Sequence, residues 1–150
     1  MQQAIELALR NVRESSGGPF AALVVRAGRI ISRGTNQVTL MNDPTAHAEI
    51  VAIRNACAAL HSFQLTGCDV YATCEPCPMC LGAIFWARPA KVFFASTKED
   101  AAAIGFDDSV IYAQIPVPPS QRRIPMLQIL REEALRAFRE WEQKPDKIRY

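Results

Sequence analysis

The order of hydrophobic and polar residues predicts a helix and then a β-hairpin in the first part of the chain. Residues 2–15 repeat apolar side chains at the spacing of an amphipathic helix, and Gly17-Gly18-Pro19 ends it. Two β-rich runs follow, over 20–26 and 29–36, and Ala27-Gly28 between them indicates a tight hairpin turn.

After the hairpin, the pattern alternates between helical and strand-like segments. Residues 42–45 hold polar N-cap candidates and open a helix with Ile50, Ile53, Cys57 and Leu60 on one face. The further predicted elements are strands over 69–73, 91–95 and 127–130, helices over 77–87 and 132–143, a short helix in an irregular stretch over 98–113, and a proline-rich loop over 116–125. Leu135, Phe138 and Trp141 of the last helix are expected to point inward. A hairpin followed by alternating helices and strands favours an α/β fold, with a mixed sheet covered by helices on both faces.

Composition narrows the class of protein. The chain has 150 residues, 49% of them hydrophobic, which suits one domain with a proper core. We expect no membrane partner, because the apolar runs fall far short of about 20 residues and no secretory segment opens the chain. Five cysteines, an odd number, indicate metal binding and buried thiols in the cytoplasm rather than disulfides. A net charge of +2 gives no indication of a nucleic-acid partner.

Two short motifs carry the candidate chemistry, His47-Ala48-Glu49 and Pro76-Cys77-Pro78-Met79-Cys80. Cys77 and Cys80 share one face at a predicted helix start, where the helix dipole favours the thiolates that bind metal. With His47 they supply three zinc ligands, and an open fourth position is typical of a catalytic zinc. Glu49 is expected above that position, where it can move a proton from a zinc-bound water to the ring nitrogen and leaving amine of a substrate.

Other interpretations of the cysteines stay open from the residues alone. A structural zinc needs a fourth protein ligand, and the candidates for it are Cys57, Cys68, Cys74 and His61. Cys74 also begins a run that resembles three ligands of an iron–sulfur site, although Ile84 stands where the fourth cysteine is expected. A zinc-stabilised interaction module without turnover is the alternative that is not an enzyme.

The motifs together resemble bacterial guanine deaminases of the cytidine deaminase-like superfamily. The H-x-E and P-C-x-x-C pair is typical of zinc-dependent nucleobase deaminases, and the likeness covers essentially the whole chain. The matching runs are Gly18-Pro19-Phe20, Gly34-Thr35-Asn36, residues 42–49 and 74–82, Trp86-Ala87-Arg88-Pro89, Gly105-Phe106-Asp107-Asp108 and the closing Tyr150. The resemblance implies a three-layer α/β/α fold with a mixed five-stranded sheet, one Zn²⁺ per chain and a homodimer. It also implies a single domain over 1–150, with the C-terminal segment, about 132–150, exchanged between subunits.

The resemblance further implies a purine pocket around the zinc. Asp108 is the expected second catalytic residue, and its carboxylate suits the N1–H and 2-amino donors of guanine, a pair that adenine lacks. Asn36 matches a residue that binds the purine edge. The other implied contacts are the aromatic rings of Phe20 and Trp86, the backbone N–H of Ala48, and Tyr150 as the residue that closes the pocket. Plain structural roles stay open for these residues: turns for Asn36 and Asp108, core positions for the two rings, and an unordered terminus for Tyr150.

The reaction implied is the hydrolytic deamination of guanine to xanthine and ammonia. A tRNA adenosine deaminase is the alternative enzyme, because such proteins share the runs over 44–49 and 75–80. They need a basic surface and a pocket open to an extruded nucleotide, which the weak net charge does not indicate. Cytosine deamination is a further alternative, since the zinc motifs do not select the base.

Overall fold

A mixed sheet organises the first of two units in the chain. The computed structural model describes residues 1–149, and the boundary between the units follows Asp108. The sheet has the order β2-β1-β3-β4. Its strands are β1 (Ala21–Arg26), β2 (Arg29–Thr35), β3 (Cys68–Cys74) and β4 (Lys91–Ser96). Because β1 runs antiparallel to β2 and β3 while β3 and β4 are parallel, the predicted mixed sheet is confirmed.

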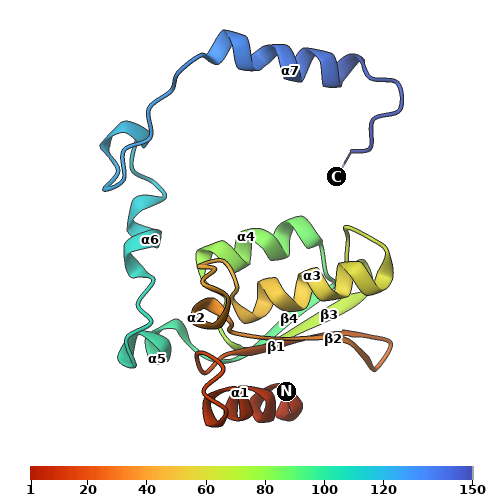
Figure 1. Cartoon of the computed structure of the whole chain (residues 1–150), viewed down its shortest axis with the longest axis vertical. Coiled ribbons are helices and arrows are strands. Elements are labelled where there is room, and N and C mark those ends of the chain that lie inside the picture. Colours follow the sequence, from red (N-terminus) through yellow and green to blue (C-terminus); the bar gives the residue numbers. More distant parts are fainter. Residues whose placement is uncertain (150) are drawn as a thin grey trace. The chain divides into compact units, whose positions relative to one another are not determined.

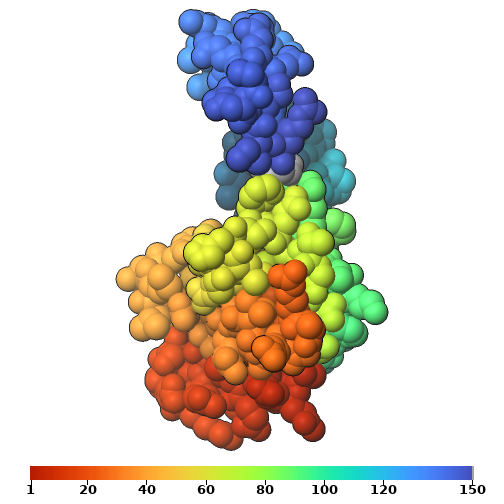
Figure 2. All heavy atoms as spheres, turned by 90° about the vertical axis from the view of Figure 1, so that its right-hand side faces the viewer, coloured from red at the N-terminus to blue at the C-terminus, as the bar shows by residue number. Residues whose placement is uncertain are grey.

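The predicted hairpin joins β1 to β2 through Ala27 and Gly28. Both residues have positive φ, 48° and 74°, as a type I′ turn requires. Arg26 pairs with Arg29 across the turn and with Cys68 on the other side, so the turn lies beside the loop that precedes β3 (Figure 2). The candidate site residues follow the C-terminal ends of β2 and β3, which lie at the edge of the sheet away from this turn.

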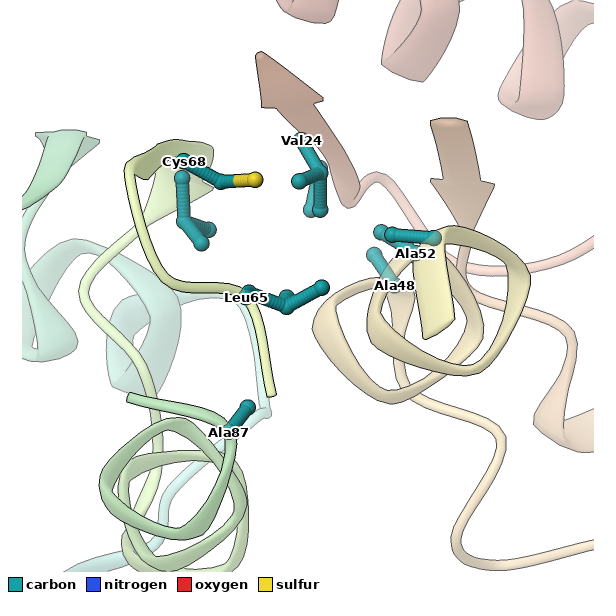
Figure 3. Close-up of a cluster of buried hydrophobic side chains, with 9 residues drawn as sticks. Val24, Ala48, Ala52, Leu65, Cys68 and Ala87 are labelled. Carbon is teal, nitrogen blue, oxygen red and sulfur yellow. The ribbon is translucent and has the colours of Figure 1, made fainter. Parts of the chain in front are cut away.

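Helices cover both faces of the sheet, which gives the expected three layers (Figure 1). One face carries α1 (Gln2–Arg13), and the other carries α3 (Ala48–Leu60) and α4 (Pro78–Ala87). Leu65, fully buried, points into the space between α3, α4 and the sheet (Figure 3). The core cluster around it comprises Ala22, Val24, Ala48, Ala52, Ala56, Cys68, Val70 and Ala87.

The helix α3 lies unusually close to β2, and small residues make this possible. Its buried stripe is Ala48, Ala52 and Ala56, one turn apart, whereas Ile53, Cys57 and Leu60 are only partly buried at the edge of the core. A Cβ on Gly34 of β2 would lie 2.1 Å from the carbonyl oxygen of Ala48. Close contact between backbones therefore fixes where α3 begins relative to the end of β2.

Short helices complete the connections of the first unit. The helix α2 (Val38–Met41) was not expected from the sequence, and it occupies the loop between β2 and α3. The helix α5 (Lys98–Ala103) follows β4 and begins with a capping box, in which Thr97 and Asp100 exchange hydrogen bonds. This box starts α5 directly after the sheet, and the chain then continues through Phe106 to Asp108.

The second unit contains α6 (Ser109–Gln114), a 3₁₀ turn η1 (Pro119–Gln121) and α7 (Arg131–Gln143). The predicted fifth strand over 127–130 is wrong for residues 1–149, where the sheet has four strands. Pro125 has no N–H to donate, and the backbone of Met126 instead donates to the carbonyl of Pro119, at 2.9 Å.

The prediction that the apolar face of α7 points inward is also wrong within a single chain. Phe138 and Trp141 expose 72% and 44% of their surface, and Leu135 is half-buried. No residue of α6 or α7 is buried, so the described part of this unit has no core of its own to receive that face. Within residues 1–149, no helix combines the length and the apolar character that a membrane crossing needs.

Candidate active site

Two helix starts bring three metal-binding side chains together. His47 is the N-cap residue of α3, and Cys77 is the N-cap residue of α4, both with extended backbone. Cys80 follows in the first turn of α4 and is fully buried. The Nδ1 atom of His47 lies 3.5 Å from the Sγ atom of Cys77 and 3.5 Å from that of Cys80. The structure therefore confirms that the two sequence motifs meet.

The spacing of these three atoms fits a zinc ion. In a tetrahedral site, Zn–S bonds of about 2.3 Å and Zn–N bonds of about 2.0–2.1 Å place sulfur and nitrogen about 3.6 Å apart. The observed distances of 3.5 Å agree with that separation. All ligand atoms of the group lie within 4.8 Å of one another. Two sulfurs and one imidazole nitrogen are also the donor types that zinc prefers.

Hydrogen bonding among the ligands prepares one thiolate before any metal binds. The bond from Cys80, together with the bond to His47, lowers the pKa of Cys77 to about 4. The same contact with Cys77 and burial raise the pKa of Cys80, and the negative charge of Glu49 raises it further. The bond to Cys77 raises the pKa of His47. Zinc binding at this site must therefore release the remaining thiol proton.

The carboxylate of Glu49 lies beside the three metal-binding side chains but does not belong to the group. Its side chain is 7% exposed, and burial raises its pKa. The thiol of Cys80 donates to the Oε2 atom of Glu49, at 3.4 Å. A buried carboxylate with a raised pKa is suited to proton transfer near neutral pH.

The remaining thiols do not complete a fourth ligand in the part of the chain that the structure describes. Across residues 1–149, the metal-binding group consists of His47, Cys77 and Cys80. The Sγ atom of Cys74 donates to the carbonyl of Thr97 at 3.4 Å, and Cys68 belongs to the core cluster. This arrangement argues against both the structural-zinc and the iron–sulfur interpretations.

Asn36 and an aromatic pair border the loop that precedes β1. Asn36 is 7% exposed and follows β2. Phe20 and Phe106 pack edge to face, with ring centroids 4.9 Å apart. A Cβ on Gly18 would lie 3.3 Å from Cγ of Asn36 and 3.5 Å from Cζ of Phe106, so both side chains converge on this glycine. The sequence did not predict Phe106 as a site residue, although it lies in the run Gly105-Phe106-Asp107-Asp108 that resembles guanine deaminases.

Asp108 is half-buried at the end of the first unit. Desolvation raises the pKa of its carboxyl, and the negative charge of Cys77 raises it further. Asp108 is thus close enough to the metal ligands to be affected by their charge.

Three further residues, Ala48, Trp86 and Tyr150, were predicted to contact the substrate. Ala48 is buried directly after His47, at the first position of α3. Trp86 lies near the far end of α4 and is 64% exposed, and its substrate contact stays a prediction. Tyr150 lies outside the described residues, so its role also stays a prediction.

Three zinc-binding side chains and an adjacent buried carboxylate at two helix starts are typical of zinc-dependent deaminases, which are hydrolases that act on C–N bonds. Residues 1–96 match the family model described as the cytidine and deoxycytidylate deaminase zinc-binding region. The chain belongs to this family.

Comparisons over the whole chain agree with this assignment. Guanine deaminase from Bacillus subtilis is 50% identical over 150 residues, which cover 100% of this chain and 96% of that protein. Its crystal structure superposes with a TM-score of 0.96, covering 99% of this chain and 95% of that one. A guanine deaminase from Nitrosomonas europaea is 33% identical, with a TM-score of 0.69 and coverage of 93% and 80%. Other similar structures hold 8-azaguanine or 2,6-diaminopurine.

A second group of relatives matches a shorter part of the chain. The tRNA-specific adenosine deaminase of Aquifex aeolicus is 42% identical over 95 residues, which cover 61% of this chain and 63% of that protein.

Proposed function

We propose that this chain is a zinc-dependent deaminase that hydrolyses guanine to xanthine and ammonia. The observation that carries the proposal is the contact of the buried Glu49 carboxylate with a three-residue zinc site, in a chain similar over its full length to a guanine deaminase. The three protein ligands bind one Zn²⁺ per chain. Zinc held there supplies a water acidic enough to serve as nucleophile, because bound zinc lowers the pKa of water toward about 7.

Glu49 moves the protons of the reaction. Its carboxylate accepts a proton from the attacking water and returns it to the purine ring nitrogen next to the amine-bearing carbon. A second transfer protonates the amine, which leaves as ammonia while a carbonyl forms on the ring. Burial supports this role, since it raises the pKa of Glu49 above its ordinary value and makes the carboxylate a stronger base.

Asn36 and Asp108 select the base. The carboxylate of Asp108 accepts hydrogen bonds from N1–H and the 2-amino group of guanine, and it also acts as a second proton carrier. The amide of Asn36 offers both a donor and an acceptor to the purine edge. Phe20 forms an aromatic wall of the pocket, and the backbone N–H of Ala48 contacts the base. Trp86 and Tyr150 complete the pocket.

Neighbouring aspartates offer a matched test of this specificity. Asp108→Asn should lower kcat/KM for guanine by about 100-fold, because a misplaced or missing substrate contact in the transition state costs about that much. Asp107→Asn serves as the control and should stay within about two-fold of the unaltered chain. Both variants should keep one zinc per chain. Unchanged guanine kinetics in Asp108→Asn would contradict the assignment.

A homodimer with exchanged C-terminal segments accounts for the exposed apolar surfaces. The α7 helix exposes Phe138 and Trp141, and α1 exposes Ile5, Leu9 and Val12. Burying such surface against a second copy removes it from water. We propose that residues 132–150 pack on the partner subunit.

Light scattering on the full chain tests this assembly, because a dimer is expected to become a monomer in Phe138→Glu. Glu140→Lys, on the polar face of the same helix, should stay dimeric. A monomeric unaltered chain would contradict the proposal.

The five free thiols support a reducing compartment, and we propose the cytoplasm.

A further inference from the structure

A single buried amide on α1 joins two segments that border the proposed purine pocket. Asn11 is 4% exposed, although the other residues of the last turn of α1 face solvent. Its Nδ2 atom donates to the carbonyl oxygen of Gly18 at 2.9 Å and to that of Asn36 at 3.1 Å. These two bonds use both hydrogens of the amide nitrogen.

The two joined segments are also in direct contact with each other. Gly17 has a φ of +149°, and a Cβ there would lie 2.0 Å from the carbonyl oxygen of Asn36. The backbone N–H of Asn36 donates to the carbonyl of Phe20, at 3.0 Å. The 17–20 loop and Asn36 therefore form one close-packed unit, and the Asn11 amide lies behind it.

The side chain of Asn36 depends on this backbone support for its orientation. Its Oδ1 atom accepts a hydrogen bond from the N–H of Val38 at 3.4 Å, which is long for such a bond. Buried carbonyl groups lose free energy when they lose their donors. Without Asn11, the carbonyl of Gly18 would keep only the N–H of Phe20 as a donor. The buried carbonyl of Asn36 would have to move to replace the donor that Asn11 supplies, and the Asn36 amide would move with it.

We propose that Asn11 is a positioning residue that, by joining the Gly17–Phe20 loop to the end of β2, holds Asn36 in the geometry needed to bind the purine base. The inference rests on the proposed function, in which Asn36 contacts guanine. Asn11 itself lies behind the loop and acts through Asn36.

Kinetics of guanine turnover by the zinc-loaded full chain test this role. Asn11→Ala should lower kcat/KM by about 10- to 100-fold, mainly through a raised KM, since small displacements of substrate contacts have effects of that size. Zinc content should stay at one per chain. Asn11→Ser keeps one donor on a shorter side chain, so its kcat/KM should lie between that of Asn11→Ala and that of the unaltered chain. This variant replaces Asn11→Ala in the test if Asn11→Ala does not fold.

Two control variants separate positioning from general loss of stability. Ser32→Ala removes a buried hydrogen bond of 2.6 Å from β2 to the carbonyl of Ala52. Asn55→Ala removes an asparagine bond of 3.1 Å to the carbonyl of Arg33. Both should keep kcat/KM within about two-fold, because they lie outside the loop unit. Equal losses in Asn11→Ala and Ser32→Ala would overturn the positioning role.

A double-mutant cycle distinguishes this inference from the proposed function. If Asn11 acts through Asn36, then Asn11→Ala should change kcat/KM by no more than about two-fold in an Asn36→Ala background. Fully additive losses would overturn the positioning role while leaving the substrate role of Asn36 intact. Normal guanine kinetics in Asn36→Ala alone would overturn that substrate role, and the positioning role with it.

Discussion

The Sγ atom of Cys80 lies 3.4 Å from the Oε2 atom of Glu49, although the two residues are 31 positions apart in the chain. The contact joins the first turn of α3 to the first turn of α4. It sets a proton acceptor against a metal ligand, and both groups are buried. The contact therefore brings a buried carboxylate directly against the group of three metal-binding side chains.

Replacing the Glu49 carboxylate by an amide should separate these two activities. Glu49→Gln keeps the size of the side chain but removes its capacity to carry a proton. We expect kcat for guanine to fall by about 10²- to 10⁴-fold, the usual contribution of general acid–base catalysis. Zinc content, measured by elemental analysis, should not change. Turnover within a few-fold of normal would show that another group carries the proton.

Two neighbouring cysteines differ in their expected dependence on zinc. Cys77→Ala removes a ligand and should lose bound zinc and activity together, with a lower melting temperature because metal binding stabilises the folded state. Cys74→Ala is the control, since its thiol donates to the carbonyl of Thr97 instead. It should keep zinc. A chelator should reproduce the effect of Cys77→Ala on the unaltered chain, and full zinc occupancy in Cys77→Ala would contradict the ligand assignment.

Two glycine-to-alanine changes should have opposite effects on stability. At Gly34, a new Cβ would lie 2.1 Å from the carbonyl oxygen of Ala48 and 2.5 Å from the nitrogen of Ala52. These backbone atoms must move, so Gly34→Ala should lower the free energy of unfolding by about 3 kcal/mol or more. At Gly82, inside α4, a Cβ meets nothing within 4 Å. Gly82→Ala should stabilise by about 0.5–1 kcal/mol. Denaturant titrations measure both, and similar values would contradict the close approach of α3 to β2.

The loop before His47 gives a pH-dependent contribution to stability. Hydrogen bonds from the hydroxyl and backbone N–H of Thr45, with Arg54 nearby, lower the pKa of the Asp43 carboxyl below its ordinary 3.8. A carboxyl with a lowered folded-state pKa stabilises the protein above its unfolded pKa, and this stability is lost as pH falls through the lowered value. Asp43→Ala should therefore destabilise at pH 7, and the difference from the unaltered chain should shrink steadily below about pH 4. A constant difference across this range would contradict the Thr45 interaction.

The zinc motifs could be predicted from sequence because local rules determine their geometry. His47 and Cys77 are the N-cap residues of α3 and α4, and Pro78 stands at the first position of α4, whereas the cap candidates predicted over 42–45 lie before the start of α3 at Ala48. Side chains at helix starts tilt toward the N-terminal end, so His47, Glu49, Cys77 and Cys80 converge. The type I′ turn at Ala27-Gly28 follows from two residues in the same way.

Features that depend on contacts across the chain were less predictable. The buried stripe of α3 consists of alanines because the helix approaches Gly34 closely, and no spacing rule reveals that approach. Asn11 reads as an ordinary solvated position of an amphipathic helix until its partners at Gly18 and Asn36 are known. The apolar run over 127–130 indicated a strand, but a strand needs a neighbour, and none pairs with it within residues 1–149.

The most direct test of the proposed function is ammonia release by the zinc-loaded chain, offered guanine, adenine, cytosine and a tRNA hairpin in parallel. Release from guanine, with xanthine as the other product and little or no release from the other three, is the predicted result. Release from the tRNA hairpin alone would contradict the proposal and assign the site to an extruded adenosine. If none of the four substrates released ammonia, that result would contradict a catalytic role for the zinc site.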